Sequence, residues 1–154
     1  MLGETGDGGE MIQFMHANLF DLRADVLVNP VNCVGVMGKG VALEFKRRYP
    51  EMFDDYREAC KRGEVRPGKL HVWSGMACVV NVPTKRHWKD KSTYEDVQLG
   101  LNALNLQIIG FGKRWTVAMP ALGCGNGGLE WARVKPLIET TLGQLPNTIY
   151  VCEP

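Results

Sequence analysis

Two glycine-rich segments, about ninety residues apart, each stand between an apolar run and a helical pattern. The first covers residues 28–42 and the second residues 118–131. A strand that turns through glycines into a helix presents backbone N–H groups at the helix N-terminus, where a phosphate can bind. Two such loops on one small domain predict a ligand with two phosphates that is held from both sides. The alternative for either segment alone is an ordinary turn that uses glycine for its positive φ.

Neither segment has the sequence of the two best-known nucleotide loops. Gly38-Lys39-Gly40 lacks the Gly-Lys-Ser/Thr ending and the spacing of a P-loop. Neither segment shows GxGxxG spacing followed by an acidic residue on a second strand. These differences exclude ATP held in a P-loop and NAD held in a Rossmann crevice.

The remainder of the chain alternates between strand and helix patterns. Strands are expected over residues 11–16, 24–28, 69–74, 76–82, 115–119 and 148–152. Helices are expected over residues 41–49 and 51–61, after a capping box at residues 92–95 with Ser92 as the cap, and from Trp131 or Arg133 onward. This alternation predicts an α/β fold with helices on both faces of a mixed sheet. Both glycine loops then lie at the carboxyl edge of the sheet, where such folds bind ligands.

Length and charge indicate the number of domains and argue against some classes of binding partner. The first ten residues hold four glycines and three acids, so we expect a disordered lead-in over residues 1–10 and one domain over residues 11–154. The 18 basic and 17 acidic side chains nearly cancel, which argues against a strong non-specific grip on nucleic acid. No apolar run approaches the ~18 residues of a membrane span, so no membrane partner is expected.

The cysteines and histidines show no ligand spacing. The five cysteines form no CxxC pair and the three histidines are scattered, so no disulfide framework, metal site or cofactor is expected. This pattern favours a reducing, cytoplasmic location. Cys33 and Cys124 lie inside the glycine loops, where we interpret them as small side chains that fill space rather than as nucleophiles.

Residues capable of chemistry follow two of the expected strands. Asn32 heads the first loop, and its amide can both donate to and accept from a sugar diol, whereas Asn29, before Pro30, fits a turn. Lys85 follows a buried strand that ends at Pro83. Partial desolvation there would lower the pKa of the lysine and make it a nucleophile. An amine that attacks the anomeric carbon of a sugar, or its ring-opened aldehyde, forms a Schiff base.

A basic and aromatic loop, residues 84–91, follows the same strand. Arg86, His87 and Trp88 are candidate DNA contacts, because aromatic rings stack on bases and cations meet phosphates. His87 could act as an acid or base near neutral pH, or pack on Trp88. A solvated charged loop is the alternative for the whole segment.

In combination these motifs resemble the macrodomain family of ADP-ribose-binding proteins, over about residues 11–151. The runs that carry the resemblance are residues 37–46, Gly63-Glu64-Val65, Pro83-Thr84-Lys85-Arg86, Ser92-Thr93-Tyr94-Glu95, and Gly123-Cys124-Gly125 with Leu129-Glu130-Trp131. The chain is most similar to the branch that holds the human terminal ADP-ribose glycohydrolase and the DarG-type DNA ADP-ribosyl glycohydrolases, and residues 29–40 and 84–88 look most like the DarG type. This resemblance implies a three-layer α/β/α sandwich around a mixed sheet.

The resemblance also implies an activity and a set of site residues. It implies an antitoxin enzyme that removes ADP-ribose from thymidine in single-stranded DNA, where a DarT-type toxin attaches it. The implied partners are ADP-ribose, ADP-ribosylated single-stranded DNA, and the toxin, through a C-terminal domain that lies beyond this chain. Lys85 would be the nucleophile on the distal ribose and Asn32 would orient that ribose. The implied ADP-ribose ligands are Asn18, Leu19, Gly35, Val36, Met37, Gly38, Gly40, Val41, Thr84, Gly123, Cys124, Gly125, Asn126, Gly127, Gly128 and Leu129.

Two positions depart from the family pattern. Asn18 stands where many macrodomains have an aspartate that binds the adenine amino group, and Gly127 stands where the human relative has an aspartate that acts as acid or base. A thymine nitrogen leaves with a delocalised negative charge and needs less proton donation than an alkoxide, and Glu130 or His87 could assist. Two alternatives stay open: a reader that binds ADP-ribose without cleaving it, and a hydrolase of protein-linked ADP-ribose or O-acetyl-ADP-ribose.

Overall fold

A single six-stranded sheet organises the part of the chain that the computed structural model describes, residues 11–154. The expected lead-in over residues 1–10 lies outside the described residues. In chain order the strands are β1 (Ile12–Met15), β2 (Val26–Val31), β3 (His71–Ser74), β4 (Cys78–Pro83), β5 (Val117–Pro120) and β6 (Ile149–Cys152). Their order across the sheet is β1-β6-β5-β2-β4-β3, and every neighbouring pair is parallel except β3 with β4. The predicted mixed sheet is therefore confirmed.

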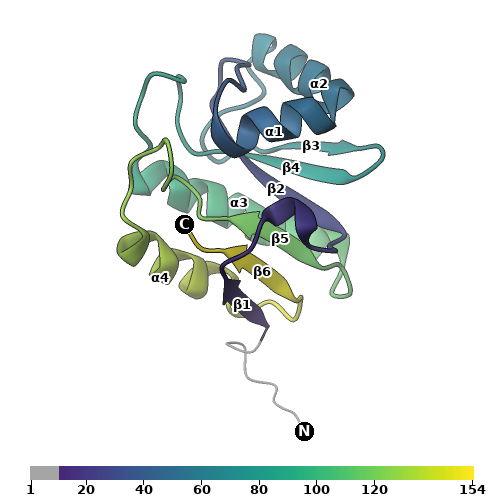
Figure 1. Ribbon diagram of the computed structural model, residues 1–154, viewed down its shortest axis with the longest axis vertical. Helices are drawn as coiled ribbons and strands as arrows, with labels where there is room; N and C mark the ends of the chain where they lie inside the picture. Colours follow the sequence, from purple (N-terminus) through teal and green to yellow (C-terminus); the bar gives the residue numbers. More distant parts are fainter. Residues whose placement is uncertain (1–10) are drawn as a thin grey trace, which may run out of the picture.

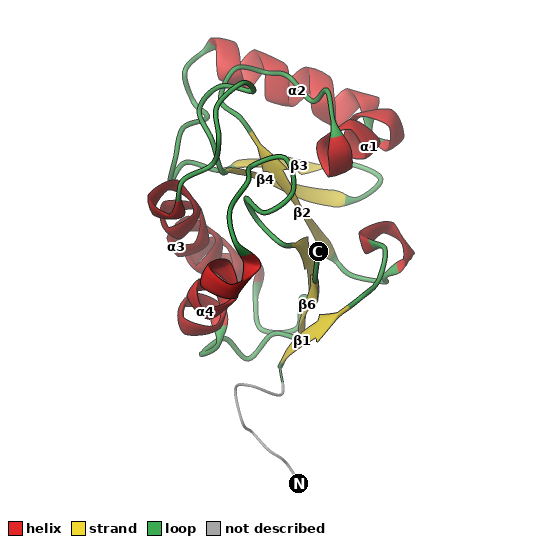
Figure 2. Ribbon diagram, turned by 60° about the vertical axis from the view of Figure 1, so that its left-hand side comes forward, coloured by secondary structure: helices red, strands yellow, loops and turns green. Residues whose placement is uncertain are grey.

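Two pairs of helices cover the two faces of the sheet (Figures 1 and 2). The helices are α1 (Gly40–Arg48), α2 (Pro50–Lys61), α3 (Tyr94–Phe111) and α4 (Trp131–Leu142), and a short 3-10 helix, η2, spans Leu19–Asp21. Alternate side chains of β2 enter opposite layers, as a strand of period two requires. Val26 and Val28 pack in the core under α3 and α4, whereas Leu27 and Val31 pack under α1 and α2. This arrangement confirms the predicted three-layer sandwich.

The second strand is longer than its sequence indicated. It continues past Val28 to Val31, so Asn29 is a buried strand residue and not a turn residue. The expectation of a strand end before Pro30 was wrong because β5 pairs with β2 only at residues 26 and 27. Beyond that point one side of β2 carries no ladder, and a proline, which has no N–H to donate, is tolerated.

The cap of α3 lies one residue later than the capping box predicted. Thr93 is the N-cap, and its side chain accepts a hydrogen bond from Asp96 N at 3.1 Å. Ser92 instead donates its backbone N–H to Gly127 O at 3.0 Å, which draws it under the second glycine loop. Helix α4 begins at Trp131, one of the two predicted starts.

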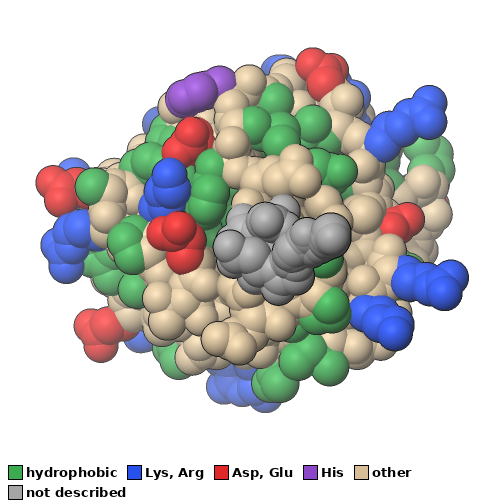
Figure 3. All heavy atoms as spheres, turned by 90° about the horizontal axis from the view of Figure 1, so that it is seen from below, with side chains coloured by type: hydrophobic (Ala, Val, Ile, Leu, Met, Phe, Trp, Pro, Cys, Tyr) green, Lys and Arg blue, Asp and Glu red, His purple; other side chains and the backbone are tan. Residues whose placement is uncertain are grey.

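The topology brings three loops to one end of the sheet (Figure 1). Strands β2, β4 and β5 run parallel, so the segments that leave their carboxyl ends meet there. From below, the molecule shows lysines and arginines interspersed with acids and no continuous basic surface (Figure 3). On this face, then, neither sign of charge dominates.

Candidate functional site

Lys85 is held against the first glycine loop by its backbone neighbours. Thr84 N donates to Val31 O at 2.9 Å, and Cys33 N donates to Arg86 O at 2.9 Å. These two bonds extend the β2–β4 pairing on either side of Lys85, whose own carbonyl lies 3.6 Å from Cys33 Sγ. The lysine side chain is half-buried. The structure thus brings Lys85 and the first loop together, as the sequence predicted from their strand ends.

The Asn32 side chain shapes the loop that it heads. Its Oδ1 accepts from Val34 N at 3.0 Å and from Val36 N at 3.4 Å, and its Nδ2 donates to Val36 O at 2.7 Å. The residue is only 5% exposed. One Nδ2 hydrogen keeps no partner among the described residues, so a ribose hydroxyl would have to use that hydrogen. Contact between Asn32 and a ribose remains a prediction.

Tyr56, which the sequence analysis did not identify, holds Asn32 in position by hydrogen bonding. Its hydroxyl donates toward Asn32 O at 2.8 Å and lies 2.9 Å from Asn32 Oδ1. Burial raises the pKa of Tyr56, so the phenol keeps its proton and remains a donor. No local pattern connects residue 56 in α2 with residue 32, which is why sequence reasoning missed the pair.

The first glycine loop leaves a run of backbone N–H groups unused. Within the described chain, no hydrogen-bond acceptor faces the amides of Met37, Gly38 or Lys39. The first intrahelical bond of α1 runs from Leu43 N to Lys39 O, so the amides of residues 40–42 are free as well. Lys39 caps the helix without a side-chain hydrogen bond. Six consecutive amides at an uncapped helix start favour an anion.

The second glycine loop divides its amides into two sets. The amides of Cys124, Gly128 and Leu129 donate to the carbonyls of residues 121, 125 and 123 at 3.1, 3.2 and 3.0 Å. The amides of residues 125–127 have no acceptor in the part of the chain that is described. This second set is the one that can receive an anion, and the contacts predicted for the first set would have to use other atoms.

The two loops meet at their tips. A Cβ on Gly40 would stand 2.9 Å from Asn126 Nδ2, and the φ of Gly40 is +58°, so glycine is required at this point of contact. The free amides of both loops therefore border one region. Lys91 adds a charge to it, because its side chain runs beside Gly128, with Nζ 3.8 Å from the position of a Cβ there. Lys91 was not among the predicted site residues.

Gly127 is buried between Ser92 and Gly123. A Cβ at this position would lie 2.3 Å from Ser92 Oγ and 2.4 Å from Gly123 O. Ser92 Oγ is itself buried without a partner in the described chain. The position at which the resemblance pointed to an aspartate in a relative thus has no room here for any side chain, and residue 127 offers no carboxylate.

The thiols of the two loops are poor candidates for nucleophiles. Burial raises the pKa of Cys33 to about 11 and also raises the pKa of Cys124. A thiol that keeps its proton at neutral pH attacks slowly. All five cysteines are free. These directions agree with the interpretation that Cys33 and Cys124 fill space.

The basic loop after Lys85 is folded and not merely solvated. Arg86 lies 3.4 Å from the buried carboxylate of Asp96, which fixes it to α3 although its side chain is 72% exposed. His87 stacks on Trp88, with ring centroids 5.4 Å apart. His87 therefore packs on Trp88, and a role of His87 as an acid or base stays a prediction. Contact of these residues with DNA remains a prediction.

Asn18, predicted at the adenine, and Leu19, a predicted ADP-ribose ligand, lie at the start of η2. Asn18 is the N-cap of this short helix, and its Oδ1 accepts from Phe20 N at 2.9 Å. The Oδ1 atom retains a second lone pair that could accept from an adenine amino group. Leu19 is buried in the core under α1 and α2.

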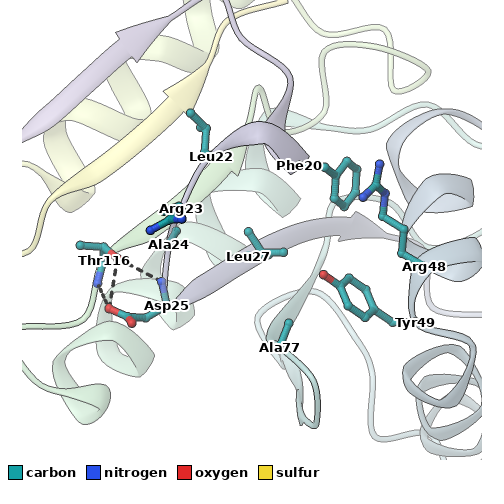
Figure 4. A pocket seen from close by; sticks show the side chains of 10 residues that line it. All are labelled: Phe20, Leu22, Arg23, Ala24, Asp25, Leu27, Arg48, Tyr49, Ala77 and Thr116. Carbon is teal, nitrogen blue, oxygen red and sulfur yellow. Dashed lines mark hydrogen bonds between the residues drawn. The ribbon is translucent and has the colours of Figure 1, made fainter.

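A cavity of about 420 Å³ lies away from these loops. Figure 4 shows Phe20, Arg48 and Tyr49 on one side of it, and Asp25, hydrogen-bonded to Thr116, on the other. The cavity borders the amino ends of β2 and β5, and none of the predicted site residues lines it. It is therefore separate from the glycine-loop site.

Residues 11–154 present neither a cluster of metal ligands nor a helix that could span a membrane. No cluster of three His, Cys, Asp or Glu side chains there is arranged to hold a metal ion. Among the helices of this part of the chain, none has the length and apolarity to cross a bilayer.

The sequence matches the family model described as Macro domain over residues 28–138. The DNA ADP-ribosyl glycohydrolase of Mycobacterium tuberculosis is 45% identical over 149 residues, and that of Thermus aquaticus is 42% identical over 150 residues. Each alignment covers 94% of this chain, but the chain spans only about two fifths of the length of these relatives. Human ADP-ribose glycohydrolase OARD1 is 28% identical over 136 residues, which cover 85% of this chain and 84% of the human protein.

Solved structures give the same picture. The macrodomain of Mycobacterium tuberculosis DarG superimposes with a TM-score of 0.88 at 44% identity, and the match covers 94% of this chain and 97% of that one. Thermosipho africanus DarTG in complex with ADP-ribose superimposes with a TM-score of 0.86 at 33% identity, covering 93% of this chain and 41% of that one.

Proposed function

The chain belongs to the Macro domain family, and we propose that it binds ADP-ribose and hydrolyses the bond between ADP-ribose and thymidine in single-stranded DNA, which reverses the action of a DarT-type toxin. One observation supports the proposed binding of ADP-ribose. The free amides of residues 37–42 and 125–127 border one region where the two loops meet, beside the strand end that bears Lys85. Such an arrangement suits a diphosphate whose attached ribose extends toward the lysine.

In the proposed chemistry Lys85 attacks the distal ribose. The unprotonated Nζ forms a bond to the anomeric carbon, and the bond from that carbon to thymine breaks with its electron pair going to the thymine ring nitrogen. The thymine anion takes up the proton that the attached amine loses, and the ribose ring then opens at the same carbon to give a Schiff base with Nζ, while the ring oxygen takes a proton from solvent. Water adds its oxygen to this carbon, the carbon–Nζ bond breaks with its electron pair going to Nζ, and the sugar ring closes on the resulting aldehyde. This step releases ADP-ribose and returns the lysine. The loop amides hold the diphosphate throughout, and the Tyr56–Asn32 contacts keep the first loop in shape.

The absent carboxylate at position 127 favours thymine as the leaving group. No acid can stand there to protonate an alkoxide leaving group, whereas a thymine anion is stabilised by its two carbonyls. We therefore propose ADP-ribosylated DNA over ADP-ribose that is linked through a hydroxyl oxygen. The cytoplasmic location expected from the cysteines is part of the same proposal.

The test compares release of ADP-ribose from a single-stranded oligonucleotide modified on thymidine by wild type, Lys85→Ala and Lys113→Ala. Lys113 is an exposed lysine before β5, at the opposite end of the sheet, and serves as the matched control. Wild type and Lys113→Ala should release ADP-ribose, and Lys85→Ala should not, while calorimetry shows that all three bind ADP-ribose. Full turnover by Lys85→Ala would refute the lysine mechanism.

The same missing carboxylate supports one second candidate, a reader that binds ADP-ribose without cleaving it. In that case wild type would bind ADP-ribose tightly and release none from modified DNA or from a peptide modified on glutamate. This outcome would replace the hydrolase by the reader.

A further inference from the structure

The loop after β4 carries a local excess of positive charge. Residues 85–91 hold four basic side chains and one acid, whereas the whole chain has 18 basic and 17 acidic side chains. The loop begins at Lys85 and ends beside the second glycine loop, where Ser92 N donates to Gly127 O. A polyanion that reaches the site would therefore meet this segment first.

At the centre of the loop stands an exposed indole. The Trp88 side chain is 45% exposed, which is unusual for so large an apolar ring. The imidazole of His87 stacks on it at an interplanar angle of 29°, and Lys89 Nζ lies 5.1 Å from the ring centroid. The Trp88 ring is thus supported by His87 and exposed to solvent, and the Lys89 ammonium lies close to it.

Hydrogen bonds within the loop order the residues on either side of Trp88. Lys89 N donates to His87 Nδ1 at 3.1 Å, so the neutral imidazole carries its proton on Nε2. His87 N donates to Asp90 Oδ2 at 3.2 Å, and Asp90 N donates to His87 O at 3.0 Å. A ring ordered in advance loses little conformational freedom when a partner stacks on it.

We propose that Trp88 is a stacking platform for the unpaired base next to the modified thymidine, and that Lys89 turns to the adjacent phosphate when the base arrives. This inference rests on the proposed function. A base stacked on an aromatic ring contributes more than the exposed cation–π contact it displaces. Of the predicted DNA contacts, Arg86 is paired with Asp96, and His87 is stacked on Trp88, so the platform is the Trp88 ring with His87 as its support.

The platform predicts a preference for single strands. In a duplex each base lies between its neighbours and both faces are covered, whereas a base in a single strand offers a free face to an aromatic side chain. The platform reads no base edge, so it tolerates any neighbouring base. It makes the domain selective for a modified single strand over a modified duplex or an isolated modified nucleoside.

The decisive experiment compares two substrates, a short modified single-stranded oligonucleotide and the ADP-ribosylated nucleoside without neighbours. Trp88→Ala should raise KM for the oligonucleotide about tenfold without changing kcat, and leave the nucleoside unaffected. Trp88→Phe should recover most of the loss. Trp115→Ala is the matched control, because Trp115 is 37% exposed and stacked on Phe111 at 4.8 Å, but precedes β5 at the other end of the sheet.

Equal losses on both substrates, or none on either, would overturn the platform. If wild type releases ADP-ribose from neither substrate, the proposed hydrolase fails, and the platform is then judged by binding alone. In that arm, anisotropy with a fluorescent unmodified thymidine oligonucleotide should show about tenfold weaker binding by Trp88→Ala than by Trp115→Ala. Equal binding by the two variants would overturn the platform independently of catalysis.

Discussion

Replacing Gly127 with alanine would place a methyl group where the structure has no room for one. Its carbon would lie 2.3 Å from Ser92 Oγ and 2.4 Å from Gly123 O. The serine oxygen can rotate away, but the carbonyl belongs to the backbone of the same loop. An ordinary contact begins at about 3.4 Å, so the loop must move by about 1 Å.

The cost of that movement follows from its size. Over-packing of this kind destabilises a fold by about 1–3 kcal/mol, which for a chain of this length lowers Tm by about 2–12 °C. The shift also displaces the amides of residues 125–127. Affinity for ADP-ribose should then fall about tenfold or more, because a misplacement of about 1 Å is enough to spoil a positioned group.

The matched control is Gly125→Ala in the same loop. A Cβ at Gly125 would meet nothing within 4 Å, and the substitution should change stability by no more than about 0.5 kcal/mol. Scanning fluorimetry gives Tm and calorimetry gives the Kd for ADP-ribose. If Gly127→Ala matched Gly125→Ala in both quantities, the close approach of Ser92 and Gly123 would not constrain the loop. By the same reasoning Gly127→Asp should disrupt the loop and not supply a working acid.

Three further substitutions or treatments probe the site. Tyr56→Phe removes the hydroxyl that donates to Asn32 and should lower the free energy of unfolding by about 1–2 kcal/mol in urea titrations; an unchanged midpoint would contradict the role of the bond. Burial raises the pKa of Cys33 to about 11, so iodoacetamide at pH 8 should label this thiol more slowly in the native protein than in urea. Peptide mapping would measure both rates, and equal rates would refute the burial argument. Lys91→Gln removes the ammonium beside Gly128 and should weaken ADP-ribose binding up to about fivefold at low salt and less at high salt; a salt-independent loss would point to packing instead of charge.

The sequence predicted the elements of this fold well because its strong signals are local. Strand patterns ending at glycine or proline, and the apolar face of α3 formed by Val97, Leu101 and Leu104, depend only on neighbours along the chain. The predictions were wrong where contacts between residues far apart in the sequence determine the local structure. Pro30 is tolerated in β2 because β5 stops pairing after residue 27, and Ser92 fails to cap α3 because Gly127 binds its amide.

The residues of the candidate site likewise fall into those that the sequence predicted and those that it did not. Lys85, Asn32 and both glycine loops lie where strand ends predicted them, since parallel strands share a carboxyl edge. Tyr56 and Lys91 carry no recognisable motif, and their positions follow from packing across α2 and across the second loop. Sequence patterns could not reveal which loop amides stay free either, because that depends on how Asn32 and residues 121–129 bond internally.

The sheet order has a consequence for the newly made chain. β5, which leads into the second glycine loop, is held by four registered pairs to β6 and by only two to β2. β1 pairs only with β6 among the described strands, through Ile12 with Ile149 and the pairs that follow. Contacts that span nearly the whole chain close slowly and cannot form before both partners have left the ribosome. We therefore expect a nascent chain to remain without the site until residues 149–152 emerge. The last strand of this sheet in chain order then completes both the edge of the sheet and the loop that receives the ligand.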